Sequence, residues 1–261
     1  MDLGIEGKVA LVTGGSKGLG RAIALDLARE GAATALCARN EAEVEATCRE
    51  IAALAGRKPL GIVADVTTPA DIERFVTVAA ERFGRVDLLV NNAGRATPGR
   101  FDTLSDAQWQ ADLDLKLFSQ IRCTRAVLPL MRAVGGGRIV NINAVYGKMP
   151  DPAFFATSTN RAACLGFSKA LAMELAPEDI LVNSVNIGFV DTPQWDDIWR
   201  RRAPDLDRAA FLAQMARQDV PMGRFGTADE VAGLVTFLCS RQASYITGAS
   251  VDIAGGMGKY L

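Results

Sequence analysis

A glycine-rich segment near the start of the chain has residues suited to holding a pyrophosphate. Gly14, Gly18 and Gly20 follow the apolar run Val9–Val12 and open a segment of helical period, Leu19–Arg29. Glycine lets the backbone turn tightly and approach a phosphate, and the free N–H groups at the start of a helix favour an anion. A strand, a glycine turn and a helix in this order predict a dinucleotide-binding site.

The residues after the second apolar run indicate which dinucleotide is bound. A carboxylate at this position would hydrogen-bond the ribose hydroxyls of NAD. The sequence instead reads Cys37-Ala38-Arg39-Asn40, with no acid and one arginine. Arg39 and Lys17 are cationic donors that suit the additional phosphate of NADP. We therefore expect NADP(H) as the cofactor; the alternative is that both side chains are solvated surface cations.

Composition excludes several other kinds of site. The chain of 261 residues has no histidine and five scattered cysteines, so neither a histidine-based nucleophile nor a metal site is expected. Unclustered thiols are typical of a reduced, cytoplasmic protein. The net charge of −1 gives no reason to expect nucleic acid or an anionic membrane as a partner. The sequence contains no run of 18 apolar residues, so no membrane span is predicted. The N-terminal residues do not resemble a secretory signal.

Two kinds of segment alternate along the chain. Strands are predicted at Val9–Val12, Thr34–Cys37, Gly61–Ala64, Leu88–Val90, Arg138–Ile142, Leu181–Val185 and Ser250–Ile253. Helices are predicted at Leu19–Arg29, Glu41–Ala53, Pro69–Arg82, Asp106–Met131, Thr159–Leu175 and Ala228–Leu238. This alternation predicts an α/β fold: a single Rossmann-like, doubly wound domain over residues 1–261, with about seven parallel strands between two layers of helices.

One segment interrupts this alternation. Residues 191–227 include Trp195, Trp199 and three consecutive arginines, Arg200 to Arg202. The segment is too long for a plain loop, so we expect it to contain short helices.

Four motifs resemble those of the short-chain dehydrogenase/reductase family, and the resemblance runs almost end to end. They are Thr13-Gly14-Gly15-Ser16-Lys17-Gly18-Leu19-Gly20, then Asp65-Val66, then Asn91-Asn92-Ala93-Gly94, and finally Gly188, Val190 and Thr192, where Ile187 replaces a proline. The resemblance implies nucleotide contacts from Gly14, Ser16, Lys17, Gly18, Leu19, Gly20, Arg39, Asp65, Val66, Asn92, Ala93, Gly94, Arg161, Gly188, Val190 and Thr192. It also implies that residues 191–227 form a substrate lid. Family members pair through two long helices, here Asp106–Met131 and Thr159–Leu175, so a homodimer or homotetramer is expected.

The same resemblance places other residues where the family carries its catalytic Asn, Ser, Tyr and Lys. They are Lys116, Ala144, Thr157 and Arg161. A threonine hydroxyl has no accessible ionisation and arginine is always protonated, so the family's tyrosine-based proton relay cannot operate. Arg161 retains the ability to hold the nicotinamide ribose. Asn143 can supply an amide to the pocket only if the strand ends before it, because neighbours in a strand face opposite sides.

Lys116 is the one replacement that can exchange a proton. Burial close to Arg161 would lower its pKa toward neutrality, since desolvation and a like charge act in the same direction. We expect Lys116 to protonate a carbonyl oxygen, directly or through water, while Thr157 holds that oxygen. The alternative is that Lys116 points into solvent or pairs with Asp112 or Asp114.

Three functions remain open at this point. The first is an atypical NADP(H)-dependent oxidoreductase that reduces a carbonyl or oxidises an alcohol on a small substrate. Two cations favour a carboxylate-bearing substrate, with apolar walls from Tyr146, Phe154, Phe155 and Trp195; these aromatics are alternatively ordinary packing residues. The second is a non-redox lyase or dehydratase on the same scaffold. The third is an inactive NADP-binding subunit, paired with an active paralogue.

Overall fold

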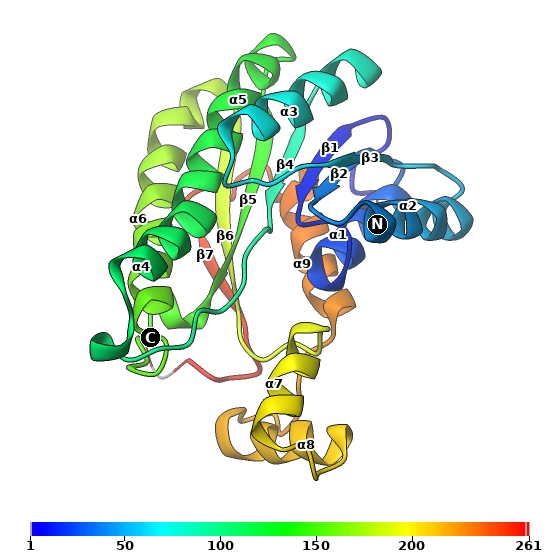
Figure 1. Ribbon diagram of the computed structural model, residues 1–261. Coiled ribbons are helices and arrows are strands. Elements are labelled where there is room, and N and C mark those ends of the chain that lie inside the picture. The colour runs from blue at the N-terminus through cyan, green and yellow to red at the C-terminus, as the bar shows by residue number, and fades with distance from the viewer. Residues whose placement is uncertain (1, 259, 261) are drawn as a thin grey trace.

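A single parallel sheet organises the protein, which is described here by a computed structural model over residues 2–258 and 260. The strands are β1 (Val9–Thr13), β2 (Ala33–Ala38), β3 (Leu60–Val63), β4 (Leu88–Asn91), β5 (Gly137–Ala144), β6 (Ile180–Ile187) and β7 (Ser250–Ile253). They lie in the order β3-β2-β1-β4-β5-β6-β7 (Figure 1). The order reverses between β1 and β4, so the crevice beyond their carboxyl ends is the expected ligand site.

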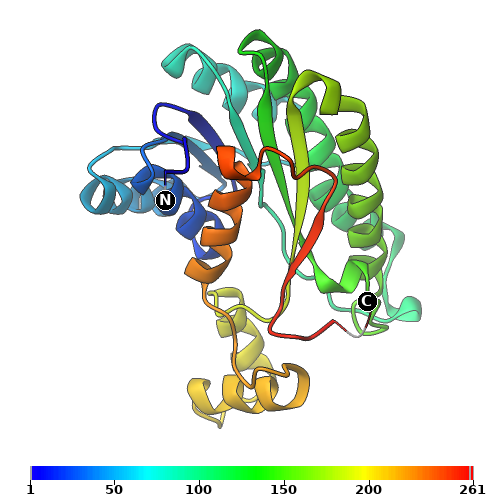
Figure 2. The ribbon, with the colours of Figure 1, turned by 180° about the vertical axis from the view of Figure 1, so that it is seen from behind.

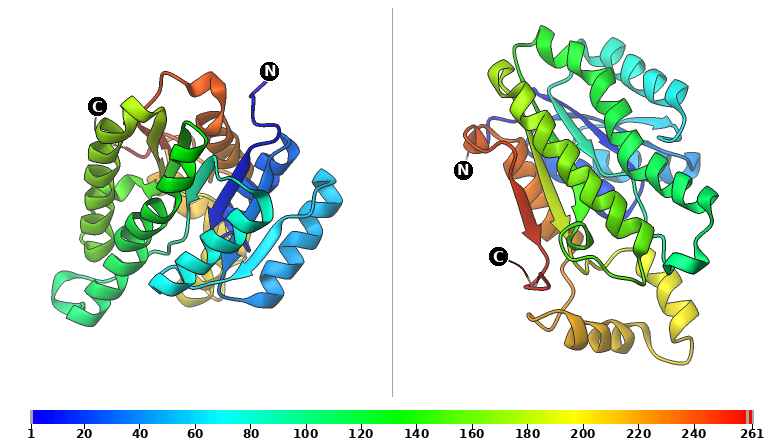
Figure 3. Two further views of the ribbon diagram at one scale, coloured as in Figure 1. Left: turned by 90° about the horizontal axis from the view of Figure 1, so that it is seen from above. Right: turned by 90° about the vertical axis from the view of Figure 1, so that its left-hand side faces the viewer.

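Helices cover both faces of this sheet (Figure 3). They are α1 (Gly18–Arg29), α2 (Glu41–Ala55), α3 (Pro69–Phe83), α4 (Asp106–Leu113), α5 (Ser119–Ala133), α6 (Phe155–Leu175), α7 (Gln194–Arg202), α8 (Arg208–Asp219) and α9 (Ala228–Cys239). Alternate residues of each strand enter two different cores. Val12 packs with α1, α2 and α9, whereas Leu11 packs with α3, α5 and α6. The predicted doubly wound α/β fold is confirmed.

The long helix predicted at Asp106–Met131 is interrupted. It consists of α4, a π-helical turn over Asp114–Phe118, and α5. A π turn accommodates one additional residue within a helix, and such turns are frequent at functional sites. Lys116 lies inside this turn. Apolar periodicity in the sequence does not reveal such a local change in hydrogen bonding.

The segment that interrupts the alternation contains two short helices, as expected. Helices α7 and α8 pack on each other through Trp195, Phe211 and Leu212, which form a small apolar core. Arg208 joins the two helices by ion pairs to Asp191 and Asp196. Figures 1 and 2 show this unit projecting beyond the carboxyl ends of the strands.

The cysteines take no part in crosslinks. All five are buried and unpaired, and burial raises the pKa of the Cys123 and Cys239 thiols to about 12. Such thiols are not nucleophiles at neutral pH. None of the helices in the described part of the chain has both the length and the apolar character needed to cross a bilayer.

Candidate active site

The glycine turn between β1 and α1 is held in a conformation that only glycine can adopt. A Cβ atom on Gly20 would overlap the carbonyl oxygen of Gly14 and lie 2.5 Å from the side-chain nitrogen of Asn92. Helix α1 begins at Gly18, and its N-cap residue, Lys17, makes no side-chain cap hydrogen bond. The first turn carries no acidic side chain. The N–H groups at this helix start therefore remain available to an anion.

Asn92, at the end of β4, fixes the position of this turn. Its side-chain nitrogen donates to the carbonyl oxygens of Thr13 and Gly14 at 2.9 and 3.1 Å. The backbone N–H groups of Asn92 and Ala93 both donate to the Thr13 hydroxyl at 3.0 Å. Two segments that are 79 residues apart in the sequence thus form one edge of the crevice.

The segment after β6 reaches the same edge. A Cβ atom on Gly18 would lie 3.6 Å from Cβ of Thr192, so Thr192 stands against the glycine turn. Val190 is buried and forms an isolated bridge with Gly226 at the base of the α7–α8 unit. A Cβ atom on Gly188 would come within 2.8 Å of Ala254, so a larger residue would displace this loop. Of these three predicted nucleotide residues, the fold brings Thr192 into contact with the glycine turn.

Glu43, which the sequence did not indicate as a site residue, lies in the predicted phosphate clamp. Lys17 donates to one carboxylate oxygen of Glu43 at 2.9 Å, and the Ser16 hydroxyl donates to the other at 3.1 Å. Arg39 is exposed and lies at the end of β2, as predicted.

The Asp65 carboxylate accepts two hydrogen bonds from Thr67, so it is engaged within its own turn. Val66 beside it is buried.

Lys116, Asp112 and Thr157 form a buried cluster beyond the end of β5. The side chains of Lys116 and Asp112 are both fully buried and form an ion pair. The Lys116 ammonium also donates to the Thr157 hydroxyl at 2.8 Å. Burial, and secondly the charge of Arg161, lower the pKa of Lys116 to about 8, although Asp112 acts in the opposite direction. Of the alternatives left open by the sequence, the pairing with Asp112 is the one observed.

Two further residues complete the hydrogen bonds of this cluster. The Asn160 side chain donates to the second carboxylate oxygen of Asp112 at 2.8 Å. The backbone N–H of Thr97 donates to the Thr157 hydroxyl at 3.0 Å, and that hydroxyl donates to the Thr97 carbonyl at 3.4 Å. Both lone pairs of the hydroxyl oxygen are therefore used. Its proton has only a long hydrogen bond, which a better acceptor can replace.

Arg161 lies on α6 and points across the end of β5. It donates to the carbonyl oxygen of Ile142 at 2.7 Å, while its buried Nε has no hydrogen-bond partner. A Cβ atom on Gly94 would come within 2.9 Å of the guanidinium, so this glycine makes room for it. Burial lowers the pKa of Arg161 below its usual value, and the residue nevertheless remains cationic because that value is so high. An unpartnered buried donor at this position is a candidate ligand contact.

Asn143 lies within strand β5, so the strand does not end before it, as an amide facing the pocket would require. Strand β5 continues to Ala144, so Asn143 and Ala144 face opposite sides. The Asn143 side chain donates to the backbone carbonyl of Arg161 at 3.0 Å. Its amide N–H₂ group thus supports helix α6, and Ala144, on the opposite side of the strand, has only a methyl group.

The four aromatic residues predicted to line the substrate pocket lie in three different places. Tyr146 and Phe154 stack with ring centroids 5.1 Å apart, and burial raises the pKa of the Tyr146 phenol to about 12. Phe155 faces away from them, against Trp109 and the exposed Phe101. Trp195 is buried in the apolar core of the α7–α8 unit. Only Tyr146 and Phe154 pack against each other as the predicted wall requires.

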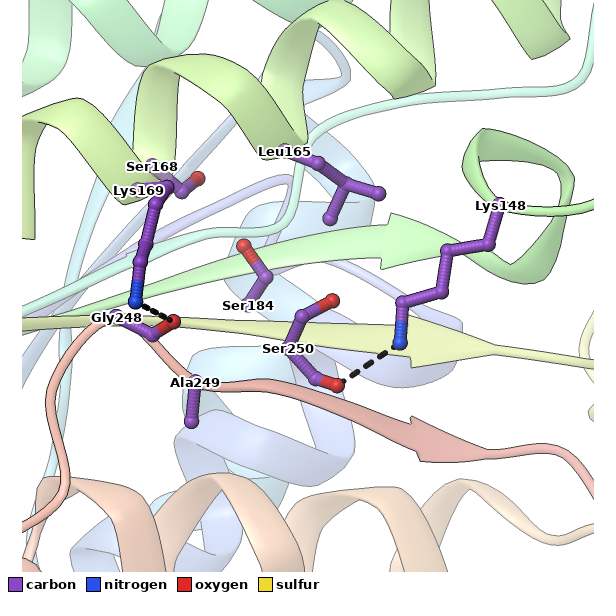
Figure 4. A pocket seen from close by; sticks show the side chains of 8 residues that line it. All are labelled: Lys148, Leu165, Ser168, Lys169, Ser184, Gly248, Ala249 and Ser250. Carbon is purple, nitrogen blue, oxygen red and sulfur yellow. Dashed lines mark hydrogen bonds between the residues drawn. The ribbon is translucent and has the colours of Figure 1, made fainter. Parts of the chain in front are cut away.

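One cavity in the described chain lies away from this cluster. It has a volume of about 220 Å³ and is shown in Figure 4. Helix α6 and strands β6 and β7 line it, with Lys148 and Lys169 at its two ends, and both lysines donate to carbonyl oxygens of residues at β7. None of the predicted nucleotide, catalytic or substrate residues lines this cavity.

Three residues of the site were not predicted as site residues from the sequence: Asp112, Asn160 and Glu43. Asp112 stands four residues before Lys116, a spacing at which helical side chains meet, so its pairing was available as an alternative. Asn160 and Glu43 gave no comparable signal. Each contacts residues that are distant in the sequence.

The strand order and the glycine turn define a dinucleotide-binding fold of the Rossmann type, and comparison with known proteins shows the family. A family profile described as Enoyl-(Acyl carrier protein) reductase matches residues 14–258. The 3-oxoacyl-(acyl-carrier-protein) reductase FabG of Escherichia coli K12 is 39% identical over 255 residues, covering 98% of this chain and 99% of that protein. The chain belongs to the short-chain dehydrogenase/reductase family.

Solved structures of relatives superimpose along nearly the whole chain. L-sorbose reductase from Gluconobacter frateurii, solved with NADPH and L-sorbose, is 35% identical with a TM-score of 0.97, and the match covers all of both chains. A short-chain oxidoreductase from Pseudomonas aeruginosa PAO1, described as containing an atypical catalytic centre and solved with NADPH, is 33% identical. Its TM-score is 0.91, and the match covers 97% of this chain and 98% of that one.

Proposed function

We propose that the protein is an atypical NADP(H)-dependent oxidoreductase that reduces a carbonyl, or oxidises an alcohol, on a small substrate. NADP(H) is the cofactor, in agreement with the NADPH-bound relatives. The residues present fit it, because the glycine turn admits no side chain at Gly20 and leaves the N–H groups at the start of α1 available. When bound, the reduced nicotinamide supplies a hydride to the carbonyl carbon.

The distance of 2.8 Å between Lys116 Nζ and Thr157 Oγ1 is the observation that carries the proposal. Lys116 is fully buried, and outside its ion pair it donates to the Thr157 hydroxyl, so in our proposal its proton reaches a substrate by way of that hydroxyl. Thr157 Oγ1 receives a proton from Lys116 as its own proton passes to the carbonyl oxygen. The threonine carries no charge at any stage, so its high intrinsic pKa is no obstacle. Lys116 ends neutral, and an alcohol is formed.

Arg161 is assigned to binding rather than to proton transfer. Its guanidinium lies beside Gly94, which follows β4, and its Nε has no partner; in our proposal the nicotinamide ribose is bound here. The charges of Lys116 and Asp112 cancel within their ion pair, so Arg161 leaves the buried cluster with a net charge of about +1. This charge favours a carboxylate-bearing substrate, and the Tyr146–Phe154 stack provides an apolar wall for it.

The first experiment is a titration of the purified protein with NADPH and NADH, followed by a panel of carbonyl compounds weighted toward ketones that carry a carboxylate. Oxidation of NADPH is followed at 340 nm. We expect NADPH to bind and at least one ketone to be reduced. Binding of NADPH without turnover of any ketone would contradict the oxidoreductase proposal, and binding of neither nucleotide would contradict the cofactor assignment as well.

Variants then test the proton path. Lys116→Ala should lower kcat about 10³-fold with the dissociation constant for NADPH unchanged within about twofold, because general acid catalysis typically contributes 10²–10⁴-fold. Because this variant leaves Asp112 buried without a partner, Thr157→Val is the second test and should lower kcat about 100-fold. Thr157→Ser keeps the hydroxyl and is the matched control. Full activity in Thr157→Val would exclude the threonine from the path.

A further inference from the structure

We propose that Glu43 sets how strongly the protein prefers NADPH over NADH, because it occupies donors that the 2′-phosphate of NADPH would use. The inference rests on the proposed cofactor and concerns a residue outside the predicted clamp. Both oxygens of the Glu43 carboxylate are engaged, one by Lys17 Nζ at 2.9 Å and the other by Ser16 Oγ at 3.1 Å. Glu43 therefore presents to this turn the same chemistry as a bound phosphate: an anion that accepts from an ammonium and a hydroxyl.

Contacts on both sides hold Glu43 in this position. Its backbone N–H donates to the side chain of Asn40, the N-cap residue of α2, at 3.1 Å. One turn further along α2, the buried Thr47 hydroxyl donates to the backbone carbonyl of Ser16 at 2.6 Å. Helix α2 is thus fastened to the glycine turn, and Glu43 faces that turn as a consequence.

Because Glu43 is negatively charged, it competes with a bound phosphate for the donors Lys17 and Ser16. The hydrogen bond from Lys17, and that from Ser16 after it, hold the pKa of the Glu43 carboxyl below its usual range. The group is therefore an anion at neutral pH. A phosphate brought to the same donors must displace the carboxylate or share them with it, and two like charges at this separation repel. NADH carries no phosphate on the 2′-hydroxyl, so it meets neither the competition nor the repulsion.

Arg39 explains why NADPH is nevertheless preferred. It is exposed, it follows β2, and within residues 2–258 and 260 it takes part in no ion pair. Its charge is consequently available to the phosphate at no cost in lost pairing. Glu43 then reduces, without abolishing, the preference that Arg39 and Lys17 create.

The test compares Glu43→Gln with the wild-type protein in direct binding measurements. Calorimetric titrations use NADPH, NADH and 2′,5′-ADP, the last of which carries the 2′-phosphate without nicotinamide. Glutamine removes the charge and keeps one oxygen, which can accept from Lys17 or from Ser16. We expect the dissociation constants for NADPH and 2′,5′-ADP to fall about tenfold, and that for NADH to change by less than about twofold.

Two further variants provide controls. Glu45→Gln removes the same charge from the same helix, but Glu45 pairs with Arg49 at 3.4 Å and is exposed, so its affinities should match the wild type. Lys17→Ala should weaken binding of NADPH about tenfold and that of NADH little. In the Lys17→Ala background, Glu43→Gln should have a smaller effect than in the wild type, because the shared donor is gone.

Two outcomes would overturn the inference. If Glu43→Gln changes the affinities for NADPH and NADH by the same factor, Glu43 only supports the glycine turn. If neither affinity changes, the phosphate does not meet Ser16 and Lys17. A protein that binds NADPH but reduces no ketone would contradict the proposed reaction and leave the role of Glu43 standing, so the two failures are distinguishable.

Discussion

The nucleotide-binding turn and the Lys116 cluster lie at the same edge of one sheet, yet they handle charge in opposite ways. In the turn, the charged pair is open to solvent: the side chains of Lys17 and Glu43 are 62% and 36% exposed. In the cluster, the side chains of Lys116 and Asp112 are both 0% exposed. One region presents backbone N–H groups and a loose surface pair, while the other encloses an ion pair within packed helices.

This difference suits the two proposed tasks. An exposed pair contributes between about 0 and 1 kcal/mol, so a ligand can exchange one partner at little cost. Removing one partner of a buried pair costs about 3–5 kcal/mol, because an uncompensated charge remains in a medium of low polarity. A nucleotide must enter and leave, whereas a proton donor must stay in place while only its proton moves. Substitutions in each region test whether the exposure of the charged pair separates these two tasks.

Among the substitutions that compare the two regions, the largest effect is expected from Gly20→Ala in the glycine turn. The added methyl group would overlap the Gly14 carbonyl and crowd the side chain of Asn92, which are both part of the turn itself. Backbone cannot yield as a flexible side chain can, so the turn must distort. We expect affinity for NADPH to fall at least about 100-fold and the free energy of unfolding to fall by about 1–3 kcal/mol.

Fluorescence titration with NADPH and denaturant unfolding measure these two quantities. The activity measured at saturating NADPH separates the regions, since the Lys116 cluster is not touched. An unchanged affinity for NADPH in Gly20→Ala would show that the turn does not bind the pyrophosphate.

The turn could be predicted from the sequence because its determinants are local. A strand, three glycines and a helix lie within one stretch of chain, and each of the seven predicted strands overlaps an observed one. Periodicity and glycine positions report directly on such structure. The region of the Lys116 cluster was reached only by resemblance to a family, and its hydrogen bonds could not be derived in that way.

The contacts of the cluster depend on packing between distant segments. Thr157 is 41 residues from Lys116, and Asn160 is 48 residues from Asp112. Lys116 lies in a π-helical turn, a local change of hydrogen bonding that apolar spacing does not encode. The extent of β5, which determines the role of Asn143, is likewise a tertiary property, since pairing with β6 holds the strand to Ala144.

A second prediction concerns the pH dependence of the reduction. Lys116 donates a proton only while it is protonated, so kcat/KM should be level below a pKa of about 8 and should fall about tenfold per pH unit above it. Asp112 raises the pKa of Lys116, so Asp112→Asn should move this limb to lower pH. At pH 8 the variant should then be about three- to tenfold slower than the wild type.

A neighbouring carboxylate supplies the control for this shift. Asp114→Asn removes one negative charge from the same stretch of helix, but Asp114 contacts Arg122 and Gln110 rather than Lys116. The fall of kcat/KM with rising pH should occur at the same pH in Asp114→Asn as in the wild type. A limb that does not move in Asp112→Asn, or that moves to higher pH, would mean that Lys116 is not the group that titrates. Thermal unfolding of both variants checks that the buried cluster remains folded.

The smallest effect is expected from Gly166→Ala, which repeats the substitution at Gly20 on the helix that carries Arg161. Gly166 is exposed in the middle of α6, and a Cβ atom there meets nothing within 4 Å. Alanine restricts the unfolded chain more than glycine and is preferred in helices, so the free energy of unfolding should rise by about 0.5–1 kcal/mol. Denaturant unfolding measures this change, and affinity for NADPH should be unaltered. A loss of stability accompanied by a change in molar mass in light scattering would instead show that this face of α6 packs against another subunit. In the expected outcome the same added methyl group has opposite consequences in the two regions, because it overlaps backbone at Gly20, whereas at Gly166 it meets nothing and restricts the unfolded chain.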